Sequence, residues 1–142
     1  MNEQKENCRW SIPAEIFQPL DSEFAFTIDA CAEPWNAKCP QFLSPEVDGL
    51  SVPWRGTVWM NPPYGREIDK WIRKAYRESK RGALVVCLVP ARTETAWWHD
   101  YCLNGEIRFV RGRINFTDAT GKSGRPRFGS AIVIFHPSGE AI

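Results

Sequence analysis

The chain of 142 residues contains no long apolar run. No stretch approaches the roughly 18 to 20 consecutive apolar residues that a helix needs to cross a bilayer. Residues 1–6 are polar and lack the apolar core of a signal peptide. We therefore expect a protein of the cytoplasm that has no membrane partner.

Cysteine is sparse and irregularly placed. The five cysteines are odd in number and scattered, and no Cys-x-x-Cys pair is matched by a His-x-x-x-His pair. This pattern does not form a disulfide framework and does not indicate a zinc site. We expect reduced, mostly buried thiols and no bound metal.

Apolar and aromatic residues are plentiful. Hydrophobic residues make up 43% of the chain, which includes seven Trp and eight Phe, and this argues against disorder. The length fits one domain over residues 1–142 with a core of useful size. We expect only residues 1–9, which are polar, to be frayed.

The charge is unevenly distributed, although the net charge is only +1. Residues 1–65 hold four Lys or Arg against nine Asp or Glu, whereas residues 66–142 hold fourteen against eight. A polyanion would therefore meet the second half of the chain. The alternative is an ordinary solvated helix face.

Apolar patterns predict an α/β protein. A helix is expected after Ser11, which is a plausible N-cap, and a second helix over residues 66–81, ended by Gly82. A third, capped by Thr93 or Thr95, is expected to reach Leu103. Strands are expected at 24–28, 57–60, 83–89, 106–111 and 130–135.

The order of these elements favours a parallel sheet. From the second strand onward the order begins with βαβ units and closes with two strands whose connection is too short for a crossover helix. We therefore predict a mostly parallel sheet with a C-terminal antiparallel strand at one side.

The stretch Asn61-Pro62-Pro63-Tyr64 follows the central strand. Ligands bind at the carboxyl ends of strands in open α/β sheets. The Asn61 side chain and the Pro62 backbone each offer a carbonyl acceptor, and together they could hold both hydrogens of a planar amine. Tyr64 could stack on the base that carries the amine. The alternative is a turn that merely uses two prolines.

Further polar residues follow the first predicted strand. Asp29 precedes small residues, Ala30 and Cys31, so a cofactor amine or ribose hydroxyl could approach the chain there. The competing interpretation is a cap of the next turn. In the proline-rich loop that follows, Asn36 and Asp48 are the polar residues best suited to face a ligand, although Asp48-Gly49 is also a simple turn signal.

Taken together, these motifs resemble the phage and prophage DNA N6-adenine methyltransferases (Dam-like family). The resemblance covers Trp10 to Phe135 and rests on Asp29-Ala30-Cys31-Ala32, Asn36-Ala37-Lys38-Cys39, Asp48-Gly49-Leu50, Asn61-Pro62-Pro63-Tyr64-Gly65, Val89-Pro90-Ala91-Arg92 and Gly112-Arg113-Ile114-Asn115-Phe116. It implies an abbreviated class I (Rossmann-like) methyltransferase fold, encoded by a phage or prophage in a bacterial host cell.

The chain departs from the family pattern in three respects. The first motif, which in the family reads (Asp/Glu)-Pro-x-x-Gly, lacks its glycine here. Only 31 residues separate Asp29 from Asn61, too few for two further strand-helix units. No part of the chain looks like a separate target-recognition domain, so site selectivity would be weak or supplied by the basic loop at 120–127.

The resemblance implies methyl transfer from S-adenosylmethionine to the N6 amine of an adenine that has left the DNA helix. Its catalytic residues would be Asn61, Pro62, Pro63 and Tyr64. The implied cofactor residues are Trp10, Ser11, Pro13, Asp29, Ala30, Cys31, Asn36, Asp48 and Asn61. The candidates for phosphate contact are Arg92, Arg111, Arg113, Lys122, Arg125 and Arg127.

Two alternatives remain open at this stage. The acceptor could be another planar amine, such as cytosine N4, an RNA base or a glutamine amide. The chain could also be a non-catalytic nucleic-acid-binding module that has lost cofactor binding.

Overall fold

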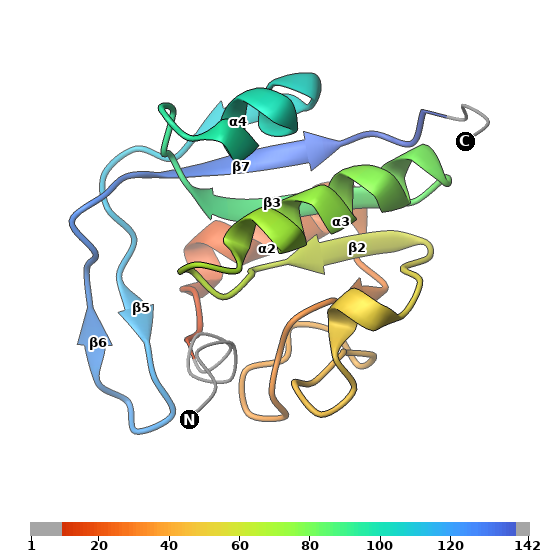
Figure 1. The fold of residues 1–142 in the computed structure, drawn as a ribbon. Helices are drawn as coiled ribbons and strands as arrows, with labels where there is room; N and C mark the ends of the chain where they lie inside the picture. Colours follow the sequence, from red (N-terminus) through yellow and green to blue (C-terminus); the bar gives the residue numbers. More distant parts are fainter. Residues whose placement is uncertain (1–9, 139–142) are drawn as a thin grey trace.

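A five-stranded sheet forms the centre of the computed structural model, which describes residues 10–138 (Figure 1). The strands are β1 (Ile28–Asp29), β2 (Thr57–Met60), β3 (Leu84–Pro90), β4 (Glu106–Phe109) and β7 (Ser130–Phe135), in the spatial order β1-β2-β3-β7-β4. β1, β2 and β3 pair in parallel, whereas β7 is antiparallel to both of its neighbours. This mixed α/β arrangement is compatible with a Rossmann-like fold.

The predicted C-terminal antiparallel strand is confirmed, but its expected place at one side of the sheet is wrong. β7 lies between β3 and β4, and β4 forms the edge. All six residues of β7 are buried, while β4 exposes both Glu106 and Phe109. The apolar strand therefore occupies the interior position and the partly polar strand takes the edge.

Helices cover both faces of the sheet. α3 (Ile68–Lys80) and α4 (Ala96–Asp100) pack on one face through residues such as Trp71 and Trp98, and α2 (Ala14–Phe24) packs on the other through Phe17. Figure 1 shows α3 in front of β3 and α2 behind the sheet. The apolar positions of α3 recur every three or four residues, which is why one side of this helix is buried.

The N-terminal helix differs from the prediction at both ends. Pro13 occupies the N-cap position, and Ser11 instead forms an isolated bridge with Thr117, so Ser11 does not cap α2. At the other end α2 continues to Phe24, and Ala25 closes it with a φ of 56°. The predicted strand at 24–28 is therefore reduced to Ile28–Asp29.

The remaining elements agree well with the prediction. Thr95 caps α4 by accepting a hydrogen bond from the backbone N–H of Trp98, and the short helix η2 (Cys102–Asn104) completes the third helical segment. The proline-rich loop contains only η1 (Gly49–Ser51). The basic loop forms part of a hairpin of β5 (Phe116–Thr117) and β6 (Ser123–Gly124).

The cysteines require one correction. Cys39, Cys87 and Cys102 are free and buried, as expected, but Cys31 is disulfide-bonded. Spacing along the chain does not reveal which thiols the fold brings within bonding distance.

The structure also bears on metal and membrane contact. Over residues 10–138, no group of three or more His, Cys, Asp and Glu side chains is arranged to hold a metal ion. The helices of this same range are all too short or too polar to cross a membrane. The expected fraying of residues 1–9 lies outside the described residues.

Candidate active site

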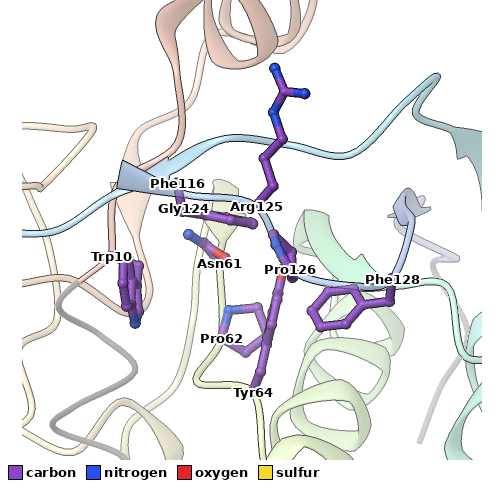
Figure 2. Close-up of a pocket in the computed structure, with 9 residues that line it drawn as sticks. All are labelled: Trp10, Asn61, Pro62, Tyr64, Phe116, Gly124, Arg125, Pro126 and Phe128. Atoms are coloured by element: carbon purple, nitrogen blue, oxygen red, sulfur yellow. The ribbon is translucent and has the colours of Figure 1, made fainter. Parts of the chain in front are cut away.

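The turn after β2 opens into a cavity of about 300 Å³ at the carboxyl edge of the parallel strands. Pro62 and Pro63 are buried, and Asn61 is partly exposed. Three residues of the turn, Asn61, Pro62 and Tyr64, line the cavity together with Trp10, Phe116, Gly124, Arg125, Pro126 and Phe128 (Figure 2). Pro63 does not reach the cavity and serves to fix the turn.

The ring of Tyr64 is held by two other aromatic rings. Phe116 meets it edge-on with centroids 6.1 Å apart, and Phe128 does so at 5.7 Å. The Tyr64 hydroxyl donates a long hydrogen bond of 3.4 Å to the Leu88 carbonyl. Burial raises the pKa of this hydroxyl well above its usual range, so Tyr64 is neutral and acts as a fixed aromatic surface.

The carboxyl ends of β1 and β2 lie side by side. The backbone N–H of Ala30 donates to the Trp59 carbonyl at 2.9 Å, and Asp29 is paired with Trp59 in the strand register. The predicted cofactor stretch Asp29-Ala30-Cys31 therefore lies next to the strand that carries Asn61.

Asp29 holds the loop that follows β1. Its carboxylate, only 2% exposed, accepts hydrogen bonds from the backbone N–H groups of Cys31 at 3.2 Å and Lys38 at 3.0 Å. Burial raises the pKa of this carboxyl group to about 7, although the two amide donors act in the opposite direction. The hydrogen bonds from the two backbone N–H groups thus offset part of the free-energy cost of burying the charged carboxylate.

Residues 10–12 form hydrogen bonds both to the loop after β1 and to the β5–β6 hairpin. The buried Asn36 accepts from the backbone N–H of Glu33 at 2.8 Å and donates to the Trp10 carbonyl at 2.9 Å. On the other side, Ser11 and Thr117 exchange two backbone hydrogen bonds of 2.8 and 3.0 Å. Trp10, which is 39% exposed, is thereby held at the mouth of the cavity.

Not all predicted cofactor residues gather at the cavity. Asp48 is exposed and caps η1 by accepting from the Leu50 N–H, as the turn interpretation requires. Pro13 begins α2, and Ser11 lies beside β5. These three residues do not line the cavity, and neither do Asp29, Ala30, Cys31 and Asn36. Of the predicted cofactor residues, only Trp10 and Asn61 line it.

The predicted phosphate-binding residues are all exposed. Arg125 contributes to the cavity wall, but its guanidinium extends away from Tyr64 and Pro62 (Figure 2). Arg92 lies over the ring of Phe128, with 5.4 Å from its guanidinium carbon to the ring centroid. The others, Arg111, Arg113, Lys122 and Arg127, lie on the surface before, within and after the hairpin.

Two aromatic wall residues, Phe116 and Phe128, were missed by sequence reasoning. Phe128 lies between Arg127 and Gly129 in an irregular segment, and Phe116 lies in the two-residue strand β5, which is too short for a periodic pattern. An aromatic residue interleaved with a basic loop is a signal that could have singled out Phe128, because stacking surfaces and cations occur together where nucleic acids bind.

A mixed α/β sheet with an Asn-Pro-Pro-Tyr turn at its carboxyl edge resembles, as a class, the enzymes that methylate amino groups of nucleic-acid bases. The family model described as DNA N-6-adenine-methyltransferase (Dam) matches residues 2–141, so the chain belongs to this family of adenine-specific DNA methyltransferases.

Two phage proteins are similar in sequence to this chain. The DNA N-6-adenine-methyltransferase of Haemophilus phage HP1 (strain HP1c1) is 29% identical over 139 residues, covering 90% of this chain and 78% of that protein. The DNA N-6-adenine-methyltransferase of Escherichia phage T1 is 34% identical over 92 residues. That match covers 63% of this chain but only 38% of the T1 protein, so the chain corresponds to well under half of the longer relative.

Proposed function

We propose that this chain transfers the methyl group of S-adenosylmethionine to N6 of an adenine in DNA, after the adenine has rotated out of the duplex into the cavity. The single observation that carries the proposal is that Asn61, Pro62 and Tyr64 line one cavity with Trp10. Family membership supports the choice of adenine N6 as acceptor.

The residues at the strand ends fit a bound S-adenosylmethionine. Ala30 and Ala32 are small residues directly after β1, at the carboxyl edge of the sheet where ligands bind in α/β proteins. We assign contact with the cofactor to Trp10 and to the backbone of residues 29–31, and we assign Asp29 and Asn36 the task of holding these groups in place. The cofactor supplies an electrophilic methyl group on a sulfonium sulfur.

The turn orients the adenine. The Asn61 side-chain oxygen and the Pro62 carbonyl each accept one hydrogen of the N6 amine, which leaves the nitrogen lone pair free to point at the methyl group. Positive charge develops on this nitrogen during transfer, and two fixed carbonyl dipoles stabilise it without reorganising. Because the ring locks φ of Pro62 and the following Pro63 restricts its ψ, the second acceptor is already in position before the base arrives.

Tyr64 offsets part of the cost of base rotation. Unstacking a base costs a few kcal/mol. Stacking on one aromatic ring contributes about 1–3 kcal/mol. Phe116 and Phe128, which meet the Tyr64 ring edge-on, fix its plane and leave a face for the adenine.

The test compares Asn61→Ala with Asn61→Asp in methyl transfer to unmethylated DNA. Asn61→Ala removes an acceptor that acts on the developing charge, so kcat should fall by about 10²-fold or more. Asn61→Asp keeps an oxygen acceptor and should retain a measurable part of the activity. Binding of S-adenosylmethionine, followed by calorimetry, should survive in both variants.

Two results would reject the proposal. Undiminished transfer by Asn61→Ala would remove the role assigned to the turn. Absence of both transfer and cofactor binding in the wild type would instead favour a module that binds nucleic acid without catalysis.

A further inference from the structure

The outward side of α3 carries four cations around a shallow hollow. Lys70, Arg73, Lys74 and Arg77 line this hollow of about 180 Å³, and Leu50 of η1 completes its wall. These positions recur at intervals of three or four residues, so they form one row on the helix surface. None of them belongs to the active-site cavity.

Only half of these charges are neutralised nearby. Lys70 pairs with Glu67 at 2.7 Å, and Lys74 pairs with Glu78 at 3.3 Å. Arg73 and Arg77, both exposed, form no ion pair with any acidic side chain among residues 10–138. The two arginines are also one helical turn apart, where like charges repel and destabilise the helix.

The row begins close to the active-site turn. α3 starts four residues after Tyr64, and Lys70 to Arg77 extends roughly 10 Å along the helix. One DNA strand presents a phosphate about every 3.4 Å of helix axis. Measured along the duplex axis, the row therefore covers the rise of about three nucleotides of one strand.

We propose that this face of α3 binds the phosphate backbone of the duplex that flanks the target base. The inference rests on the proposed function, because the flipped adenine places the rest of the duplex across the carboxyl edge of the sheet. The chemistry favours a polyanion, since two guanidinium groups that form no ion pair within residues 10–138 can each bind phosphate oxygens in a bidentate manner. The wall has one apolar member, Leu50, which offers little to an apolar partner surface.

The experiment measures binding of the full chain to an unmethylated duplex over a series of salt concentrations. The double variant Arg73→Gln and Arg77→Gln should reduce the slope of log K against log salt by about two, because each lost phosphate contact removes about 0.9. Its KM for DNA should rise roughly ten- to a hundredfold at moderate salt. Its kcat at saturating DNA and its affinity for S-adenosylmethionine should stay unchanged.

Arg55→Gln is the matched control. Arg55 is an exposed cation in the loop before β2, at the opposite end of that strand from Asn61. The Arg55→Gln variant should leave the slope of log K against log salt unchanged. Arg73→Gln alone should lower this slope by about one. Thermal unfolding should show that the double variant is at least as stable as the wild type, since a like-charge repulsion is removed.

A salt slope and KM for DNA in the double variant equal to those of the wild type would overturn the inference and leave the proposed function intact. A wild type that binds DNA through this face but transfers no methyl group would instead refute the proposed function alone. An equal decrease of the salt slope and an equal rise of the KM for DNA in Arg55→Gln would also overturn the inference, because they would show a general effect of net charge.

Discussion

Tyr64 combines two environments on one side chain. Its hydroxyl is buried against the Leu88 carbonyl, whereas its ring lines the open cavity. The two parts can be tested separately because the hydrogen bond, at 3.4 Å, is long and weak.

We predict that Tyr64→Phe transfers methyl groups nearly as well as the wild type. Tyr64→Ala removes the stacking surface, worth about 1–3 kcal/mol, and should lower kcat/KM for DNA by roughly 5- to 150-fold. Steady-state kinetics with a duplex substrate measures both variants. A large defect in Tyr64→Phe would mean that the hydroxyl, rather than the ring, carries the function.

The buried carboxyl group of Asp29 makes stability depend on pH. Its folded-state pKa of about 7 lies above the ordinary value of 3.8, so the folded protein binds this proton more tightly than the unfolded chain. The stabilisation from Asp29 is therefore present at low pH, is lost as pH rises from about 4 to about 7, and is constant above that.

Asp29→Asn tests this dependence, because its side-chain amide does not titrate. The free energy of unfolding of the wild type, relative to that of Asp29→Asn, should fall by up to about 4 kcal/mol between pH 4 and pH 7. Urea unfolding at several pH values provides the measurement. If the free energy of unfolding of the wild type, relative to that of Asp29→Asn, rises over this range, the assigned upward shift of the Asp29 pKa is wrong.

At the scale of elements, the site depends on segments that lie far apart in the chain. Residues 10–12 contact the loop after β1 through Asn36 and the hairpin through Thr117. They place an aromatic side chain, Trp10, between the parts assigned to the cofactor and to DNA. Hydrogen bonds from a loop and from the hairpin thus hold residues 10–12 in place.

Packing of η1 against the sheet also depends on one small residue. A Cβ atom at Gly49 would lie 2.6 Å from the Ala30 carbonyl oxygen and 3.1 Å from the Trp71 ring. We predict that Gly49→Ala lowers the free energy of unfolding by about 1–3 kcal/mol through overpacking. Gly129→Ala, where a Cβ atom meets nothing within 4 Å, is the control, and equal effects in both variants would refute this account.

Regular elements were predictable because their patterns are local. The apolar run of β3, the periodicity of α3 and the Thr95 cap each follow from neighbouring residues. The Asn61-Pro62-Pro63-Tyr64 motif likewise marks a turn whose place at a strand end the structure confirms.

The predictions that were wrong or missing concern residues whose partners lie far away in the chain. Ser11 pairs with Thr117 across more than a hundred residues, and Cys31 forms a disulfide that its spacing does not reveal. Asp29, by contrast, ends a strand as expected, and its buried carboxylate accepts hydrogen bonds from the nearby Cys31 and Lys38 amides, in agreement with the alternative interpretation of a cap. Phe116 and Phe128 reach the cavity only through the path of the hairpin.

For the whole molecule, the acidic and basic halves of the chain supply different parts of the proposed site. The second half supplies the hairpin, the exposed arginines and the cationic row of α3, all of which suit a polyanion. The first half supplies the strand end and the loop assigned to the cofactor.

The most direct test uses the intact wild-type chain, S-adenosylmethionine labelled in its methyl group, and unmethylated DNA. The DNA is digested after the reaction, and its nucleosides are separated. We predict that the label is found in N6-methyl-2′-deoxyadenosine and in no other nucleoside. Label in N4-methylcytosine, or DNA that stays unlabelled while the cofactor binds, would contradict the assignment of adenine N6 as the acceptor.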